Sequence, residues 1–341
     1  MARVSVIVVN WNGRQFLGKC LHSVLAQTYA DYDVVVVDNA SSDGSPELIR
    51  RDFPSVVLIV NERNLGFAAA TNTGIRSTSG EYVATINNDA QADPEWLAEV
   101  VEAMNSDDSV GMVASKMLFH DRPQVLNSTG ISLDCAAIAW DRRGGAVDDP
   151  SESSRVEVFG PSAGAALYRR KMLEDVGLFD EDFFMYLEDV DLAWRARLRG
   201  WKCIYTPSAR VLHVHSGSSL EGSAFKNYHL GRNKIWTIIK NYPSPQCFYF
   251  LPLILFYDLA SLPYTVLTRG QLSPLQGRLA ALRHFRAVLK KRREIQSGRL
   301  VDWSEFSKLL HPLESPFALL TRYRHLQKVI SNSGPIIRRV S

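Results

Sequence analysis

The chain has 341 residues, of which 46% are hydrophobic and 22% charged, a composition that is typical of a globular protein and excludes a largely disordered chain. Its formal net charge of +3 is too small to indicate a nucleic-acid-binding protein. The four cysteines lie far apart and form no CxxC pair, which argues against a zinc site or a disulfide scaffold and suits a reducing compartment.

The N-terminal third alternates apolar strands with helices. It starts directly with the apolar run at 4–9, so we expect no signal peptide. Further strands are expected at 33–37, 56–60, 82–86 and 110–115, and a small-residue helix at 66–77. Asp93 is expected to cap a helix that begins at Pro94, and residues 116–157 are expected to be irregular or short-stranded. This alternation predicts an α/β fold with a parallel sheet and right-handed crossovers.

Polar residues gather where three of these strands end. They are Asn10 and Asn12, then Asp38 and Asn39, then Asn87, Asn88 and Asp89. One such cluster alone is compatible with a simple turn, but the carboxyl ends of strands in an open α/β sheet line the ligand crevice, so three clusters predict a binding site. No GxGxxG follows the first strand and no GxxxxGK[ST] occurs, which argues against a dinucleotide-binding dehydrogenase and a P-loop enzyme.

A second group of acidic residues opens a helix that is expected to run to about Arg199 and to stop at Gly200. Its first turn carries Glu188, Asp189 and Asp191. Carboxylates are favoured at a helix N-terminus by the helix dipole alone. The apolar residues at 183–186 offer a second interpretation, because a carboxylate in apolar surroundings binds its proton more tightly and suits a general base.

Two histidines, His213 and His215, end a strand expected at 209–215, and at a spacing of two they share one face. Which of them is a ligand, and whether either is more than a structural residue, stays open. Arg232 lies on the helix expected next, where it would present positive charge to a phosphate or belong to a solvated face.

With these motifs in this order, the chain resembles the family 2 glycosyltransferases of the GT-A fold, and most closely their bacterial rhamnosyltransferase-like branch. The matching segments extend over about residues 3–240 and are VIVVNWNG (6–13), VDNASSDGS (37–45), NLGFAAATNTG (64–74), NND (87–89), FMYLEDVDLAWR (184–195), His213 and Arg232–Asn233. Each motif is weak by itself, whereas the ordered set is specific.

The resemblance implies a role for each matching residue. Asp38 would hydrogen-bond the base of a nucleotide sugar, which would be bound by Asn10, Asn12, Asp38, Asn39, Asn64, Gly66, Phe67, Asn72, Asn87, Asn88 and Arg232. Asp89 would coordinate Mg²⁺ or Mn²⁺, with His213 at the metal or the diphosphate. Asp189 would be the catalytic base, supported by Glu188 and Asp191. Asn87 replaces the first acid of the family's Asp-x-Asp motif, which leaves less charge for a hard cation.

The predicted function is the inverting transfer of a sugar, with rhamnose as a candidate, from a nucleoside-diphosphate sugar to a hydroxyl of a lipid-linked or polysaccharide acceptor. Two alternatives use similar parts. A nucleotidyltransferase also needs a nucleotide crevice and a metal, and a non-catalytic module also binds sugars. The second alternative has no use for both Asp89 and Asp189.

The resemblance ends near residue 240, so we expect a GT-A domain at 1–240 and a helical region at 241–341. The apolar stretch at 247–267 is broken by prolines and an aspartate and makes a poor membrane span. A basic amphipathic helix at 278–293 beside it predicts attachment to the cytoplasmic face of the inner membrane. The alternative is a buried helical pair that serves as core or as the contact of a homo-oligomer.

Overall fold

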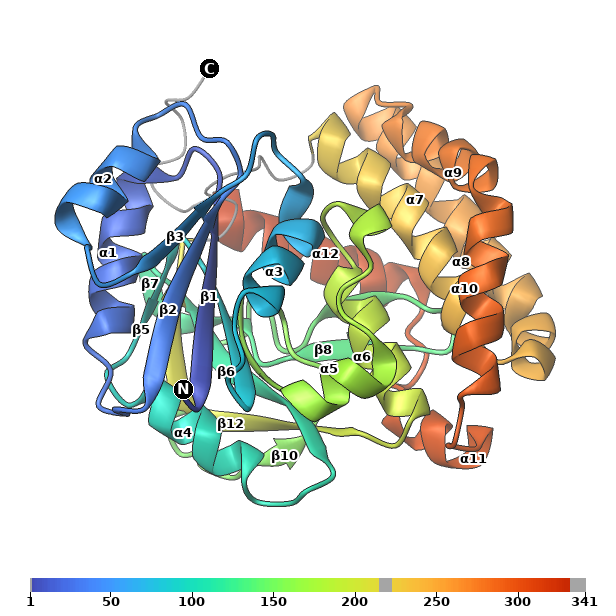
Figure 1. The fold of residues 1–341 in the computed structure, drawn as a ribbon. Coiled ribbons are helices and arrows are strands. Elements are labelled where there is room, and N and C mark those ends of the chain that lie inside the picture. Colours follow the sequence, from blue (N-terminus) through green and yellow to red (C-terminus); the bar gives the residue numbers. More distant parts are fainter. Residues whose placement is uncertain (1, 215–222, 332–341) are drawn as a thin grey trace.

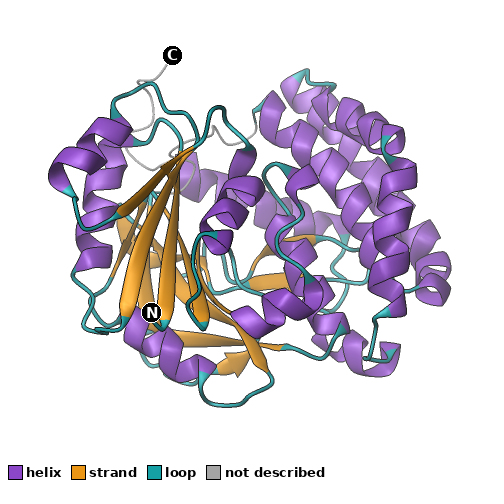
Figure 2. Ribbon diagram, in the orientation of Figure 1, coloured by secondary structure: helices purple, strands orange, loops and turns teal. Residues whose placement is uncertain are grey.

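A mixed sheet with helices on both faces forms the centre of the protein, and the C-terminal helices gather beside it (Figures 1 and 2). The computed structural model describes residues 2–214 and 223–331. The strands of the large sheet follow the order β10-β12-β6-β11-β4-β1-β2-β3, with β5 on β12 and β7 on β6, and β8 and β9 form a separate hairpin. The expected α/β fold is therefore confirmed.

The strands are β1 (Val4–Asn10), β2 (Tyr32–Asp38), β3 (Val57–Val60), β4 (Tyr82–Asn87), β5 (Ala90–Ala92), β6 (Val110–Phe119), β7 (Arg122–Ser128), β8 (Ile131–Leu133), β9 (Ala139–Asp141), β10 (Val156–Glu157), β11 (Ala165–Arg169) and β12 (Lys202–His213). The helices beside the sheet are α1 (Arg14–Leu25), α2 (Ser45–Asp52), α3 (Gly66–Arg76), α4 (Trp96–Met104), α5 (Arg170–Val176), η1 (Glu181–Phe183) and α6 (Glu188–Leu198). The C-terminal helices are α7 (Ala224–Asn241), α8 (Ser244–Arg269), α9 (Ser273–Arg283), α10 (Phe285–Ser297), α11 (Trp303–Phe306), η2 (Ser307–Leu309) and α12 (Pro316–Ser331).

The valine-rich strands are buried because both faces of the sheet are covered. Val6 belongs to a core cluster that includes residues of α1, α2 and α4 on one face, and its neighbour Ile7 belongs to a cluster that includes residues of α3, α5 and α6 on the other, as the alternation of side chains along a strand requires. Strand β1 runs parallel to both of its neighbours, and its register sets Asn10 opposite Asp38 and Val9 opposite Asn87. The polar ends of β1, β2 and β4 therefore meet at one edge of the sheet, as predicted.

Strand β12 returns to this same edge from more than a hundred residues away. It runs parallel to β6, passes an irregularity between Thr206 and Arg210, and pairs antiparallel with β5, so that His213 lies opposite Ala90. The Val214 amide then donates to the Asp89 carbonyl (3.0 Å). This pairing also corrects the expected start of α4. Residues 90–92 form β5, and the helix begins at Trp96 rather than at Pro94.

The C-terminal helices α7, α8, α9 and α10 pack together beside α6. Helix α7 lies against α6, α9 and α10, and α8 contacts α9. Among the residues that the structure describes, no helix combines the length and the apolar character that crossing a membrane requires.

Candidate active site

A buried hydrogen-bond network joins the ends of three parallel strands. The Asn10 side-chain amide donates to Asp38 (2.8 Å), and its oxygen accepts from the Asn88 side chain (2.7 Å). The second Asp38 oxygen accepts the Ser41 amide (2.8 Å), and the Ser41 hydroxyl accepts the Asn12 amide (2.8 Å). These contacts follow from the register that sets Asn10 beside Asp38, and they hold the Asp38 carboxylate at this edge of the sheet.

The turn before α3 belongs to the same edge. The Asn39 oxygen accepts from Asn61 (2.8 Å) and its nitrogen donates to the Gly66 carbonyl (3.1 Å), while the Asn64 oxygen accepts the Gly66 amide (2.9 Å). Gly66 has φ +83°, and a Cβ there would lie 2.5 Å from the Phe184 carbonyl oxygen. Only glycine allows this close approach, which brings the start of α3 against the segment that precedes α6.

Two residues expected at the nucleotide sugar are used differently in this structure. Asn72 is buried. Its side-chain nitrogen donates to the Phe179 carbonyl (2.8 Å) and to Glu181 (2.9 Å), and its side-chain oxygen accepts the Phe179 amide (3.1 Å). The Phe67 ring packs edge-on against Phe179. Both residues thus hold the Phe179 segment against α3, and their contact with a donor stays a prediction.

Asp89 and His213 form the polar centre of the site. The His213 Nε2 atom lies 3.1 Å from Asp89 Oδ1 and 3.2 Å from the Asn87 side-chain nitrogen, and its Nδ1 atom lies 2.8 Å from the Asn127 oxygen. Both Asp89 and His213 are buried. Burial lowers the pKa of His213, but the Asp89 carboxylate outweighs this effect and raises it above its ordinary value.

This pair fits one side of a divalent cation site. The Asn127 oxygen accepts a hydrogen bond from Nδ1–H, so Nε2 is the ring atom that faces Asp89 and that would bind a metal in its unprotonated form. Within residues 2–214 and 223–331, no group of three or more His, Cys, Asp or Glu side chains encloses a cation. Mg²⁺ is usually held by one or two protein ligands together with substrate phosphates, so Asp89 and His213 suit an ion whose shell a diphosphate completes. His215, the other candidate ligand, lies outside the described residues.

A strained segment leads into the acidic helix α6. Phe184, Tyr186 and Leu187 have φ of 63°, 71° and 65°, in the left-handed region that non-glycine residues rarely adopt. Such conformations cost about 1–3 kcal/mol each and persist only where the surroundings impose them. Here the buried Asn233 side chain on α7 donates to three carbonyls of the segment, those of Phe183 (3.0 Å), Met185 (2.9 Å) and Tyr186 (2.7 Å).

Asp189 and Glu188 follow this segment and differ in their environment. Burial raises the pKa of Asp189 to about 6, and the Asp141 charge adds to the effect, while the Ala163 amide, which donates to Asp189 (3.2 Å), opposes it. Burial and the neighbouring Asp189 charge raise the pKa of Glu188 well above its ordinary value. One Glu188 oxygen is buried without a hydrogen-bond partner among the described residues. Both shifts are upward, so this pair of carboxyl groups binds a proton more tightly than isolated carboxyl groups do.

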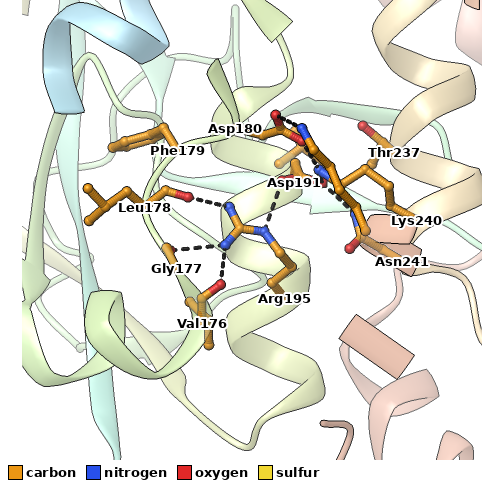
Figure 3. A network of polar contacts seen from close by, with 12 residues as sticks. Val176, Gly177, Leu178, Phe179, Asp180, Asp191, Arg195, Thr237, Lys240 and Asn241 are labelled. Carbon is orange, nitrogen blue, oxygen red and sulfur yellow. Dashed lines mark hydrogen bonds and ion pairs between the residues drawn. The ribbon is translucent and has the colours of Figure 1, made fainter. Parts of the chain in front are cut away.

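Asp191 is different from both, because it is fully paired (Figure 3). It lies 2.7 Å from the Lys240 ammonium group and 3.0 Å from the Arg195 guanidinium group, and it accepts from Asn241 (2.8 Å). Burial opposes its charge, but Lys240 and Arg195 hold its pKa below the ordinary value. Arg195 also donates to the carbonyls of Val176 (2.5 Å), Gly177 (3.0 Å) and Leu178 (2.8 Å). In the structure Asp191 anchors α6 to α7, and its supporting part in catalysis stays a prediction.

The segment 162–164 brings the strand ends and the acidic helix together. The Asn87 backbone amide donates to the Gly164 carbonyl (2.9 Å). The backbone amide of Ala163, the residue before Gly164, donates to the Asp189 carboxylate. Asp189 and the Asn87–Asp89 turn therefore border the same short piece of backbone. Arg232 does not join this network, because its guanidinium group bonds the carbonyls of Asp182 and Phe183 (both 2.9 Å).

Two bordering residues, Asn127 and Asp141, carry no motif signal in the sequence. Both lie in the region 116–157, whose short strands the sequence pattern does not resolve. Asn127 holds the His213 ring, and Asp141 raises the pKa of both His213 and Asp189.

A cavity of ≈ 710 Å³ lies away from the polar strand ends, between α5, α6 and α10. Its charged side chains are paired with one another, as in Arg76 with Glu181, Arg199 with Asp175 and Lys291 with Asp180. It contains none of the residues from the polar strand ends.

Comparison with known proteins points to one family. A family model described as "Glycosyl transferase family 2" matches residues 5–177, which is half of the chain. An uncharacterised glycosyltransferase of Nostoc is 28% identical over 182 residues, which is 51% of this chain and 53% of that protein. The N-acetylglucosaminyl-diphospho-decaprenol L-rhamnosyltransferase of Mycobacterium tuberculosis is 29% identical over 237 residues, 63% of this chain and 76% of that protein. The match thus spans about half the length of the first of these relatives and three quarters of the second.

A solved structure supports the fold. The mannosyltransferase of Pyrobaculum calidifontis, in complex with GDP-mannose and Mn²⁺, superposes with a TM-score of 0.53 at 19% identity, over 87% of this chain and 86% of that one. At this identity the likeness speaks for the GT-A-like fold alone.

Proposed function

Because the chain belongs to glycosyl transferase family 2, we propose that it transfers a sugar, with rhamnose as a candidate, from a nucleoside-diphosphate sugar to a hydroxyl of a lipid-linked or polysaccharide acceptor, with inversion. One observation carries this proposal. The 162–164 segment touches Asn87 on one side and, on the other, Asp189, a carboxylate whose pKa is about 6.

The donor would lie along the polar strand ends. In this proposal Asp38 and Asn10 bind the nucleoside, and the remaining donor contacts come from Asn12, Asn39, Asn64, Gly66, Phe67, Asn72, Asn87, Asn88 and Arg232. Asp89 and His213 would hold Mg²⁺ or Mn²⁺. When bound, the ion supplies positive charge that stabilises the leaving diphosphate.

Asp189 would act as the base. Its carboxylate takes the proton of the acceptor hydroxyl as that oxygen attacks the anomeric carbon, and the bond from this carbon to the diphosphate oxygen breaks. A single displacement of this kind inverts the anomeric configuration. A base works best when its pKa is near the working pH, which about 6 satisfies for a carboxylate.

The test is a panel of nucleotide sugars with Mn²⁺, in which hydrolysis and transfer are followed by release of the nucleoside diphosphate. We expect wild-type protein to turn over at least one donor, and Asp189→Asn to lose about 10²–10⁴-fold in turnover while donor affinity is kept. Asp108→Asn, at an exposed turn on the opposite edge of the sheet, is the control and should keep full activity. Unchanged turnover in Asp189→Asn would remove Asp189 from this role.

We propose further that residues 1–240 form the catalytic domain and that the region 241–341 attaches it to the cytoplasmic face of the membrane. Exposed apolar side chains on α8 support this proposal, because their spacing puts them on one face of the helix: Phe248 (76% exposed), Tyr249 (78%), Phe256 (57%) and Leu259 (58%). Leu275, Leu279 and Leu282 are exposed on the adjacent α9, and Arg286 and Lys290 on α10 add positive charge.

Flotation with vesicles of anionic phospholipid tests the attachment. We expect wild-type protein to float with the vesicles, the variant Phe248→Ser/Tyr249→Ser/Phe256→Ser to remain at the bottom, and activity on a water-soluble acceptor to be unchanged. Equal flotation of the triple variant would contradict attachment through α8. Size-exclusion chromatography without lipid tests the alternative. Wild-type protein that elutes as a dimer, together with a triple variant that elutes as a monomer, would favour the homo-oligomer instead.

A further inference from the structure

A third carboxylate, that of Asp141, belongs to the β8–β9 hairpin, which is bonded to the segment that leads to Ala163. Asp141 ends β9 and pairs with Ile131 of β8, whose amide donates to the Gly160 carbonyl (2.8 Å) three residues before Ala163. A Cβ built on Gly144 would lie 3.1 Å from the Asn127 carbonyl oxygen and 3.3 Å from the Asp141 Cβ, so both residues flank the same small space. Short chains of contacts therefore connect Asp141 to Asp189 and, through Asn127, to His213.

The outer side of β9 is fixed by the C-terminal segment. The Arg322 guanidinium group lies 3.9 Å from the centre of the Trp140 ring, and the His311 ring packs edge-on against the same indole. Because successive side chains of a strand point to opposite faces, Asp141 points away from these groups. The electrostatic effect of Asp141 on both Asp189 and His213 agrees with this direction.

The Asp141 carboxylate has no hydrogen bond and no ion pair within the described part of the chain. The two arginines that follow it bond elsewhere, Arg142 to Thr129 (2.9 Å) and Arg143 to Glu152. Asp148 in the same region is, by contrast, paired with Lys116 (2.8 Å). The fold thus keeps a charged acceptor beside the catalytic groups without using it internally.

An ionised carboxylate can only accept hydrogen bonds, and bonds from O–H groups to a carboxylate are short and strong. A sugar that occupies the crevice brings several hydroxyl donors. We infer that Asp141 is a specificity-determining residue that binds a sugar hydroxyl, of the transferred sugar or of the acceptor sugar. This inference rests on the proposed glycosyl transfer.

A metal at Asp141 is a weaker interpretation, because the described His, Cys, Asp and Glu side chains form no group of three that would hold one. A purely structural role is also weaker, because the hairpin is held by backbone pairing and by Trp140 on the opposite face.

The experiment compares wild type, Asp141→Ala and the isosteric Asp141→Asn, with Asp108→Asn as the matched surface control. The probes, all with Mn²⁺, are a nucleoside diphosphate alone, the nucleotide sugar that wild-type protein turns over, and an acceptor sugar. Titration gives the Kd of the first two and steady-state kinetics give the KM of the third. Melting temperatures show whether each variant is folded. If Asp141→Ala does not fold, Asp141→Asn alone tests the inference.

Loss of a charge-assisted hydrogen bond weakens binding about tenfold or more. If the hydroxyl belongs to the donor, the Kd of the nucleotide sugar rises by this factor while that of the nucleoside diphosphate does not change. If the hydroxyl belongs to the acceptor, the acceptor KM rises, and the Kd values of the nucleoside diphosphate and of the nucleotide sugar do not change. In either case a deoxy analogue without that hydroxyl should bind wild type and Asp141→Ala equally.

Sugar affinities that are unchanged in folded Asp141 variants overturn the inference and leave the proposed function intact. Wild-type protein that neither binds nor turns over any nucleotide sugar overturns the proposed function, and the inference with it.

Discussion

Replacing Asp189 with Asn should inactivate the protein and at the same time stabilise it. The fold raises the pKa of this carboxyl from 3.8 to about 6, so the folded state binds the Asp189 proton more tightly than the unfolded chain does. Ionisation of Asp189 therefore costs folding free energy. A change of one pKa unit corresponds to about 1.4 kcal/mol, which gives an upper bound of about 3 kcal/mol. Because the side chain is only partly buried, we expect about 1–2 kcal/mol.

The upward direction of the Asp189 pKa shift fixes how the free energy of unfolding depends on pH. Below pH 3.8 Asp189 is protonated in both states of the protein, and Asp189→Asn should have the stability of wild type. As the pH rises from 3.8 to about 6, wild type loses the stability that this group contributes and the variant does not. Above about 6 the variant should keep its full advantage. The measurement is urea unfolding of both proteins from pH 4 to pH 8 in buffer with EDTA.

Asp191→Asn, on the same helix, is the matched comparison and should have the opposite effect. Lys240 and Arg195 hold the pKa of Asp191 below its ordinary value, so its charge stabilises the folded state above the unfolded pKa and this contribution is lost only as the pH falls. Removing one partner of a buried ion pair costs about 3–5 kcal/mol. If Asp189→Asn destabilises the protein at pH 7.5, or if its effect does not depend on pH, our account of the acidic helix is wrong.

Three further changes test neighbouring parts of the site. Asn233→Ala leaves three carbonyls of the strained segment without their donor, so urea unfolding should show a free energy of unfolding lower by about 2–3 kcal/mol. Kinetics should show a larger loss in kcat than in donor affinity, and an unchanged kcat would contradict a positioning role. Asn127→Ala removes the acceptor that orients His213 and should weaken Mn²⁺ binding about 10–100-fold in a titration with nucleoside diphosphate; equal affinity would argue against His213 as a ligand. Asp141→Asn removes a negative charge that raises the pKa of Asp189, so the acidic limb of the pH–kcat profile should move below about pH 6, and a shift upward would contradict the arrangement.

The sheet and its polar edge could be predicted from the sequence because they depend on local patterns. Valine-rich runs that end in Asn and Asp identify buried parallel strands, and parallel pairing then brings Asn10, Asp38 and Asn87 to one edge. Helix α6 was also predictable, since its acidic first turn and Gly200, with φ +90°, mark its two ends.

The rest depends on contacts between distant segments. The three acids of α6 look alike in the sequence, but the pairing of Asp191 with Lys240 comes from a helix some fifty residues later, and this contact separates its pKa from that of Asp189. The short strands of region 116–157 are held by bridges such as Asp134 to His311, so no local pattern reveals Asp141. The later start of α4, at Trp96 rather than at Pro94, has the same origin, the pairing of β5 with β12.

The most direct test of the central claim is a crystal structure of Asp189→Asn with an intact nucleotide sugar and Mn²⁺. We predict the diphosphate beside Asp89 and His213, and the residue 189 side chain next to the anomeric carbon on the face opposite the diphosphate. A donor whose anomeric carbon lies away from residue 189, or whose diphosphate lies away from Asp89, would contradict the proposed enzyme.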